Sequence, residues 1–265
     1  MTDSHCHLGS YKFSREEVPD LIARAHEHGV HRMITLATDP DDLAINLEIA
    51  HAFPEVSACI GIHPCDVHQC PDDFESLLRP HLSDPKVAAI GETGLDYFHP
   101  APEGWSEEDY HARQRDFLRR HFEIAKDAKL NIVIHTRDRS GTRSFDDALK
   151  IYADFADDVR AVFHCFPGPP ELAERVFEAG GLISFTGIAT FKKAEAVVET
   201  VKAAPVGSFM LETDSPYLSP VPHRGKRCEP AFTKFTAEAI ALQRNTPVEN
   251  LICETEMVVE DFFRL

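Results

Sequence analysis

Eight short apolar runs alternate with amphipathic helical patterns along the whole chain, and this alternation limits the folds available to it. The runs are rich in Val, Ile, Phe and Leu without strict polar alternation, as in parallel strands buried on both faces. A (β/α)8 barrel typically needs about 250 residues, and the chain has 265. The sequence therefore predicts an α/β protein, a single (β/α)8 TIM barrel with an extra C-terminal helix, in one domain over residues 1–265. The expected strands are 1–5, 31–37, 56–62, 87–92, 131–135, 160–165, 181–185 and 208–212.

Helical patterns fill the intervals between the predicted strands. Ser14 with Glu17 forms a capping-box signature, apolar residues at helical spacing follow, and Gly29 marks a stop. Two long proline-rich segments, 96–106 and 215–230, follow the fourth and eighth strands, on the side where barrel enzymes place their active sites. The other expected helices are 40–53, 72–82, 107–129, 142–156, 170–179 and 191–203, with two closing helices at 230–243 and 247–263.

Side chains that can bind metal ions stand at the ends of five of the apolar runs. After the first run, two imidazoles lie two residues apart, which places them on one face, about 6–7 Å apart along the backbone. Single imidazoles or carboxylates follow four other runs. Strand ends of a barrel meet at one rim, so residues scattered over the sequence would converge there. These residues are His5, His7, Glu92, His135, His164 and Asp214.

The residue types at these positions indicate a metal-dependent hydrolase. Imidazoles together with carboxylates are the donor set that holds the divalent ions used in hydrolysis. Several such groups buried at a barrel mouth would be costly unless protons or metal ions neutralise and orient them. A lone satisfied polar residue explains any one position, but it explains five strand ends at once poorly.

Composition excludes several classes of protein. A formal net charge of −17 argues against a passive nucleic-acid coat, which usually has a broad basic surface. Bound divalent cations supply local positive charge, so an enzyme that handles phosphates is not excluded. Seven cysteines without a C-x-x-C pair argue against a disulfide framework or a structural zinc ribbon. Residues 1–9 carry no apolar segment, and no apolar run reaches the roughly 18 residues of a membrane span, so we expect a cytoplasmic protein without a cleaved signal.

Short motifs surround the candidate ligands and follow one another along almost the full chain. They are DSHCHL at 3–8, GIHP at 61–64, GETGLDY at 91–97, IHTR at 134–137, HCF at 164–166 and LETDSPYL at 211–218, followed by RGK at 224–226 and EP at 229–230. This ordered set resembles the TatD family of metal-dependent deoxyribonucleases. The resemblance implies a TIM barrel of the amidohydrolase-like group, a divalent-metal site, and hydrolysis of DNA phosphodiesters, often from the 3′ end.

The resemblance also implies a role for each candidate ligand. The expected cofactors are two divalent ions, Mg²⁺, Mn²⁺ or Zn²⁺. Two ions about 3.5–4 Å apart can clamp a phosphate and lower the pKa of an attacking water. Asp214 would also accept the proton of that water, which makes it catalytic together with Glu92. The first ion would be held by His5, His7 and Asp214 and the second by His135 and His164, with Glu92 as the bridge.

Other residues are candidates for substrate contact. His63 ends a strand and is expected to contact phosphate or donate a proton as a further catalytic residue, although a structural role would also explain it. Arg137, Arg224 and Lys226 follow the fifth and eighth strands, where cationic groups can hold flanking phosphates. The expected partner is single-stranded or frayed DNA, with RNA as an open alternative, and the expected state is a monomer.

Three positions depart from the family pattern. Pro167 follows His164-Cys165-Phe166 where the family usually has Ser, Cys228 replaces a usual Asn, and Gly9 replaces a usual Asp. None removes a candidate ligand. Two alternatives stay open, because a fold does not choose its chemistry. One is a barrel metallohydrolase that cleaves an amide, a lactone or an aminoacyl ester, and the other is a binding protein whose metals are vestigial or structural.

Overall fold

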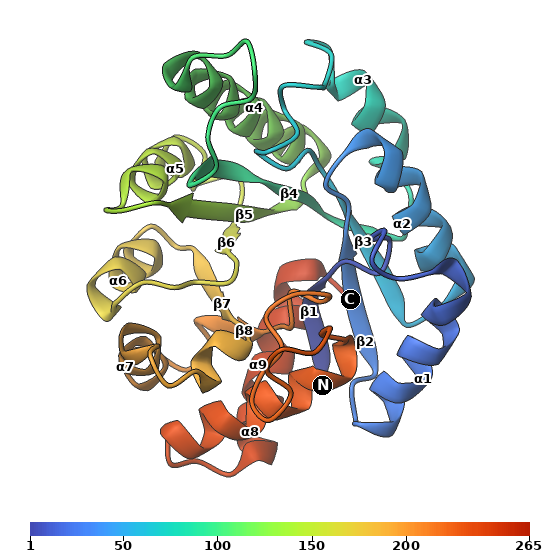
Figure 1. The fold of residues 1–265 in the computed structure, drawn as a ribbon, viewed down its shortest axis with the longest axis vertical. Coiled ribbons are helices and arrows are strands. Elements are labelled where there is room, and N and C mark those ends of the chain that lie inside the picture. Colours follow the sequence, from blue (N-terminus) through green and yellow to red (C-terminus); the bar gives the residue numbers. More distant parts are fainter.

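Eight parallel strands form one sheet that curls into a nearly closed barrel with helices around its outside (Figure 1). The structure is a computed structural model that describes residues 1–265. The strands are ordered in space as in the chain, which confirms the predicted fold class and all eight strands. They are β1 (Thr2–Cys6), β2 (Arg32–Leu36), β3 (Val56–Ile60), β4 (Val87–Tyr97), β5 (Asn131–Asp138), β6 (Ala161–Phe163), β7 (Leu182–Phe185) and β8 (Phe209–Leu211).

Helices follow the strands in the predicted order, with one clear difference in length. The predicted helix over 72–82 contains only a four-residue α-helix and a 3-10 turn, Arg79–His81. Pro80 lacks a backbone N–H, so the α-helix cannot continue through it. The remaining 3-10 turns are Arg15–Glu17, Gly187–Thr190 and Pro230–Phe232. The α-helices are α1 (Val18–Glu27), α2 (Pro40–Ala52), α3 (Glu75–Leu78), α4 (Glu107–Ala128), α5 (Arg143–Ala153), α6 (Pro170–Glu178), α7 (Glu195–Ala203), α8 (Thr233–Gln243) and α9 (Val248–Phe263).

The barrel closes through the segment that follows β8, without a regular ladder between β8 and β1. The backbone N–H of His7 donates to the carbonyl of Ser215 at 2.8 Å, and that of Asp214 donates to the carbonyl of His5 at 2.9 Å. These bonds hold the two ends of the sheet side by side. They therefore place a residue from the last strand end directly against the two imidazoles of the first.

Strand β4 is longer than predicted. It continues past Glu92 to Tyr97 and pairs with β5 as far as Asp138, with Asp96 opposite Arg137. The strand was expected to end at Glu92 and an irregular segment to begin at Asp96, but the ladder to β5 keeps the chain extended as far as Tyr97. Asp96 is consequently fixed at the rim of the barrel, fully buried.

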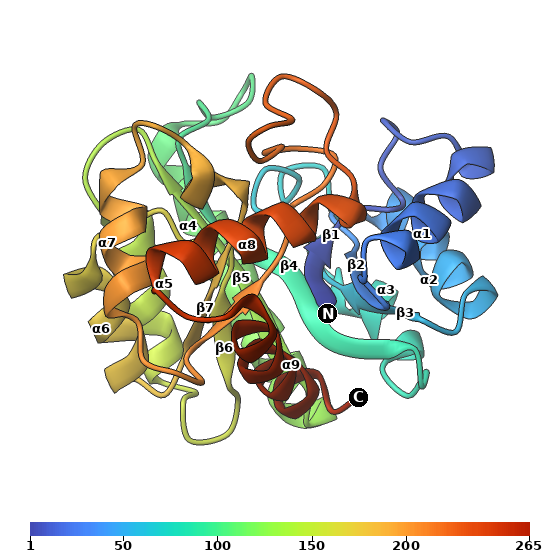
Figure 2. The same ribbon diagram turned by 90° about the horizontal axis from the view of Figure 1, so that it is seen from below.

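The interior of the barrel is closed at one end by α9, the predicted C-terminal helix. Its apolar residues Val258, Val259, Phe262 and Phe263 pack against inward-facing residues of the strands, among them Ile34 and Met210. Figure 2 shows α9 at the end of the barrel opposite the loops that follow β4 and β8. At the opposite end, where the strands have their carboxyl ends, polar side chains gather. None of the helices combines the length and the apolar character that crossing a membrane requires.

Candidate metal centre

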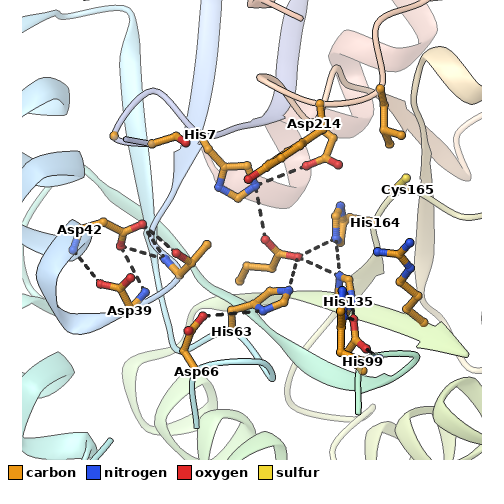
Figure 3. A pocket seen from close by; sticks show the side chains of 18 of the residues that line it. His7, Asp39, Asp42, His63, Asp66, His99, His135, His164, Cys165 and Asp214 are labelled. Carbon is orange, nitrogen blue, oxygen red and sulfur yellow. Dashed lines mark hydrogen bonds and ion pairs between the residues drawn. The ribbon is translucent and has the colours of Figure 1, made fainter. Parts of the chain in front are cut away.

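The six predicted ligands come together at the carboxyl ends of the strands. His5 lies in β1, Glu92 in β4 and His135 in β5. His7 and His164 directly follow β1 and β6, and Asp214 lies three residues after the end of β8. In Figure 3, the side chains of His7, His135, His164 and Asp214 point toward one another at the bottom of a cavity of about 980 Å³. Their roles as ligands remain predictions, but the convergence on which those predictions depend is present.

Glu92 separates the imidazoles into two sets. Its Oε2 atom lies 3.4 Å from His5 Nε2 and 3.5 Å from His7 Nε2. Its Oε1 atom lies 2.8 Å from His164 Nε2 and 3.1 Å from His135 Nδ1. A carboxylate with one oxygen on each side has the geometry of a bridge between two metal positions.

Asp214 belongs to the first set. Its Oδ1 atom lies 3.3 Å from His7 Nε2 and 3.8 Å from His5 Nε2. The residue has a positive φ of 56°, and the bond from its N–H to His5 fixes this backbone conformation. The side chain is 16% exposed, whereas that of Glu92 is 4% exposed, so Asp214 is the more accessible carboxylate from the cavity.

Hydrogen-bond acceptors outside the cluster orient the imidazoles. His7 Nδ1 lies 3.2 Å from the carbonyl oxygen of Leu36, and His135 Nε2 lies 3.1 Å from Asp96 Oδ2. In its neutral form each ring therefore keeps its proton on the outer nitrogen and directs the lone pair of the other into the cluster. His164 Nδ1 lies 3.4 Å from Glu212 Oε1, within ion-pair distance but without the geometry of a hydrogen bond.

Asp96 and Glu212 were missed as functional residues in the sequence, although both lie within the quoted motifs. Both are buried carboxylates, 1% exposed. Their role depends on contacts with strands distant in sequence, since Asp96 reaches His135 of β5 and Glu212 accepts hydrogen bonds from Ser184 and Cys165. A buried acidic residue beside a ligand motif was the available signal.

The charges of the cluster balance one another. Burial alone would raise the pKa of Glu92, but the charge of His164 and hydrogen bonds from His135 and His164 hold this pKa well below its usual value. Burial alone would lower the pKa of His7, but Asp214 and Glu92 raise it to about 9. Protons on the imidazoles thus neutralise the carboxylates, and divalent ions would displace those protons.

His63 lies beside the second set without joining its proton arrangement. Its Nε2 atom is 3.6 Å from Glu92 Oε1, and its Nδ1 accepts the backbone N–H of Cys65 at 3.2 Å. Burial lowers the pKa of His63 to about 3, so the ring is neutral and its proton stays on Nε2. This ring therefore presents an N–H donor to the cluster.

The walls of the cavity differ in charge. Asp39, Asp42 and Asp66 lie on one side, and the side chains of His164 and His135 on the other (Figure 3). Burial and the neighbouring Asp39 and Asp42 raise the pKa of Asp66 to about 6. This acidic wall was not predicted, because aspartates at a helix start usually serve as solvated caps, as Asp39 does for α2.

The predicted substrate contacts occupy different places. Arg137 lines the cavity, forms no ion pair, and stacks over the ring of Phe98 at 4.0 Å. Arg224 lies over Phe191 at 3.7 Å, and neither it nor Lys226 lines the cavity. Both are exposed and unpaired, so their contact with substrate stays a prediction.

An aromatic and basic group lies at the cavity mouth, and two of its members, Tyr11 and Lys12, were missed in the sequence. Tyr11 and Tyr217 line the cavity and are 88% and 42% exposed, and the Lys12 ammonium lies 3.9 Å from the centre of the Tyr217 ring. The mouth is thus lined by solvent-exposed rings from the loops after β1 and β8. No sequence periodicity marks these residues, because they lie in loops.

Comparison with known proteins agrees with this geometry. A family model described as TatD related DNase matches residues 2–264. The chain belongs to the TatD family. Among TatD relatives, the uncharacterized metal-dependent hydrolase YcfH of Escherichia coli K12 is 33% identical over 268 residues, covering 100% of this chain and 95% of its own. The uncharacterized metal-dependent hydrolase YabD of Bacillus subtilis is 31% identical, covering 99% and 98%. The protein is accordingly a metal-dependent hydrolase.

Solved structures support the TatD fold. The TatD homologue YjjV of Escherichia coli K12 superposes with a TM-score of 0.89 at 24% identity, covering 100% of this chain and 98% of the other. A phosphotriesterase homology protein from Escherichia coli, with phosphate in its active site, superposes with a TM-score of 0.65 at 14% identity, covering 99% and 98%. At these identities the likeness concerns the fold.

The three departures from the TatD pattern leave the cluster intact. A Cβ atom at Gly9 would lie 2.6 Å from the side chain of Asn46, so Asn46 fills the space that a larger residue would need. Cys228, in the loop after β8, is fully buried. Pro167 and Gly9 both line the cavity, so two of the three departures border the space for substrate.

Proposed function

We propose that this TatD protein hydrolyses phosphodiester bonds of DNA with two divalent metal ions and acts on unpaired strand ends. The position of Glu92 carries the proposal, because its two oxygens face two different sets of imidazoles. A bridging carboxylate suits a pair of ions, and a pair of ions suits in-line displacement at phosphorus. The TatD resemblance supports attack from the 3′ end.

The donor atoms fit divalent metal ions. In the rings of His7 and His135, one nitrogen forms a hydrogen bond with an acceptor outside the cluster, and the other nitrogen points into the cluster, as in metal-bound imidazoles. Two bound ions would polarise the phosphate and lower the pKa of the attacking water. The proposed ligands of one ion are His5, His7 and Asp214, and those of the other are His135 and His164, with Glu92 shared.

Asp214 is the proposed proton acceptor for the attacking water. Burial alone would raise its pKa, but a hydrogen bond with His7 and the charges of His7, His5 and His164 hold this pKa below its usual value. The carboxylate is therefore ionised at neutral pH. It is also the more exposed of the two carboxylates in the cluster, so water and substrate can reach it.

His63 is the proposed donor to a phosphate oxygen or to the leaving oxygen. The N–H of Cys65 occupies its Nδ1, which keeps the proton on Nε2, the atom that faces Glu92. A neutral N–H in a buried site can stabilise developing negative charge without neutralising the carboxylate. Substrate contact, rather than ligation of a metal ion, therefore suits this ring.

The charge of the cavity walls supports action at strand ends. A strand that crossed the cavity would bring successive phosphates against Asp39, Asp42 and Asp66. Arg137 on Phe98 and Lys12 on Tyr217 offer unpaired cations beside exposed rings, which suit phosphates and unstacked bases. A strand end can use these contacts and leave the acidic wall to solvent.

The same acidic wall favours a second candidate, hydrolysis of an uncharged or cationic ester, lactone or amide. Such a substrate would gain from Asp39, Asp42 and Asp66, whereas a polyanion must avoid them. The metal cluster serves either reaction, because polarised carbonyl and phosphoryl groups need similar stabilisation.

A substrate panel separates the two candidates. The metal-loaded protein is incubated with linear and circular single-stranded DNA of one sequence, with the linear strand labelled at the 3′ or the 5′ end, and with nitrophenyl esters and lactones. We expect Mg²⁺- or Mn²⁺-dependent release of the 3′ label first, with the circular strand resistant. Cleavage of esters with no cleavage of any DNA would overturn the nuclease proposal. The Glu92→Gln protein serves as the control for contaminating nucleases.

A further inference from the structure

A second group of metal-binding donors lies beside the cluster, outside the ligands described above. It comprises Cys65, in the loop between β3 and α3, Asp96, near the end of β4, and His99, two residues past the end of that strand. One donor atom from each lies within 4.8 Å of the other two. Figure 3 shows His99 next to His135 at the edge of the cavity.

The distances within this group match a tetrahedral ion. Cys65 Sγ lies 3.6 Å from His99 Nδ1, and His99 Nδ1 lies 3.1 Å from Asp96 Oδ2. Zinc bonds of about 2.3 Å to sulfur and about 2.0–2.1 Å to nitrogen or oxygen give tetrahedral edges of about 3.5 Å for S···N and about 3.3 Å for N···O. These two edges therefore match a tetrahedral ion, and the donor atoms of Cys65 and Asp96 lie within 4.8 Å of each other.

Asp96 can serve this group and the main cluster together. Its Oδ1 accepts the backbone N–H groups of Phe98 and His99 at 3.0 and 2.9 Å, which fixes the carboxylate plane. Its Oδ2 lies 3.1 Å from His135 Nε2 and 3.1 Å from His99 Nδ1. A carboxylate oxygen accepts in two directions, so one can remain with His135 while the other faces an ion.

We propose that Cys65, Asp96 and His99 bind a Zn²⁺ ion at a site separate from the centre around Glu92. Thiolate with imidazole is a donor set that selects zinc over Mg²⁺ or Mn²⁺, which prefer oxygen. Binding replaces the thiol proton with the metal, so one proton is released to solvent. The side chain of His99 is 48% exposed and lines the cavity, which leaves a path for a fourth ligand from water.

Cobalt substitution tests this site independently of activity. None of the donors around Glu92 is sulfur, so a sulfur-to-cobalt charge-transfer band in the near ultraviolet reports Cys65 alone. Fully reduced, metal-free protein is titrated with Co²⁺, and the absorbance and the bound cobalt are measured. We expect the band in the wild type. We also expect Cys65→Ser to lose it and to bind one equivalent less, and His99→Asn to weaken cobalt binding at this site by about 10-fold or more.

Two matched variants guard against other thiols. Cys165→Ser removes a thiol that lines the same cavity, and Cys253→Ser removes an exposed one, and both should keep the band. A titration with Zn²⁺ should displace cobalt and abolish the band. The proposal is overturned if the wild type shows no band, or if the Cys65→Ser protein keeps it while its circular dichroism shows a native fold. In that case Cys65 and His99 share only a hydrogen bond.

Discussion

Replacing Glu92 with Gln removes the charge that both sets of imidazoles share while it keeps the volume of the side chain. The amide offers one acceptor oxygen, and its NH₂ group would face imidazole lone pairs on the other side. Since Oε1 and Oε2 face different proposed metal positions, this single change should weaken the binding of both ions. Replacing a ligand that contacts only one ion would weaken the binding of that ion alone.

The expected size of the metal-dependent shift in melting temperature follows from the linkage between metal binding and folding. Two ions, each present at about 100 times its dissociation constant, add about 5 kcal/mol to the free energy of unfolding. For a chain of this length, that raises the melting temperature by about 10–20 °C. Removing a hydrogen-bond partner of a metal ligand lowers metal affinity by about 10–100-fold. Removing the carboxylate of Glu92, a proposed ligand itself, should therefore lower the affinity for each ion by at least about 100-fold. The metal-dependent shift would then fall to about 2–3 °C.

Differential scanning calorimetry of Glu92→Gln with and without Mn²⁺ measures this shift. The metal-free protein should stay folded, because the imidazoles that lose their counter-charge can release protons. Asp66→Asn is the matched control, since Asp66 lines the same cavity and its Oδ2 lies 3.9 Å from His63 Nδ1, outside the proposed ligands. A full metal-dependent shift in Glu92→Gln would refute the bridging role.

Four further predictions concern the same cluster. Asp214→Asn should lower kcat by about 10²–10⁴-fold in steady-state kinetics, because an amide cannot accept the proton of the water, and a near wild-type kcat would exclude that role. Glu212→Gln should weaken metal binding by about 10–100-fold in calorimetric titration, and unchanged affinity would show that Glu212 does not orient His164. Metal affinity should rise as pH increases toward about 9, because the raised pKa of His7 means that protons compete with the metal below it. The metal-free protein should lose stability between the usual imidazole pKa of about 6.5 and about 9, as His7 gives up its proton to solvent, and a flat pH profile of chemical denaturation would contradict this.

Local patterns were sufficient for much of the architecture. The apolar runs and helix-stop signals located all eight strands, because buried parallel strands need continuous apolar residues whatever their neighbours. The predicted end of β4 came five residues too early, because Gly94 and Asp96 are poor strand formers. Only the pairing with β5 keeps them extended. The helix expected over 72–82 was too long because Pro80 was not given its full weight.

The candidate site divides in the same way. The sequence by itself determined which donors stand near the strand ends, because motif and strand end coincide at His7 and His164. Only the tertiary structure decided which oxygen of Glu92 faces which imidazole, and that aspartates at the start of α2 form one wall of the cavity. The physical reason is that strand order brings these residues to one rim of the barrel. The direction in which each side chain points depends on contacts between strands that are far apart in the chain.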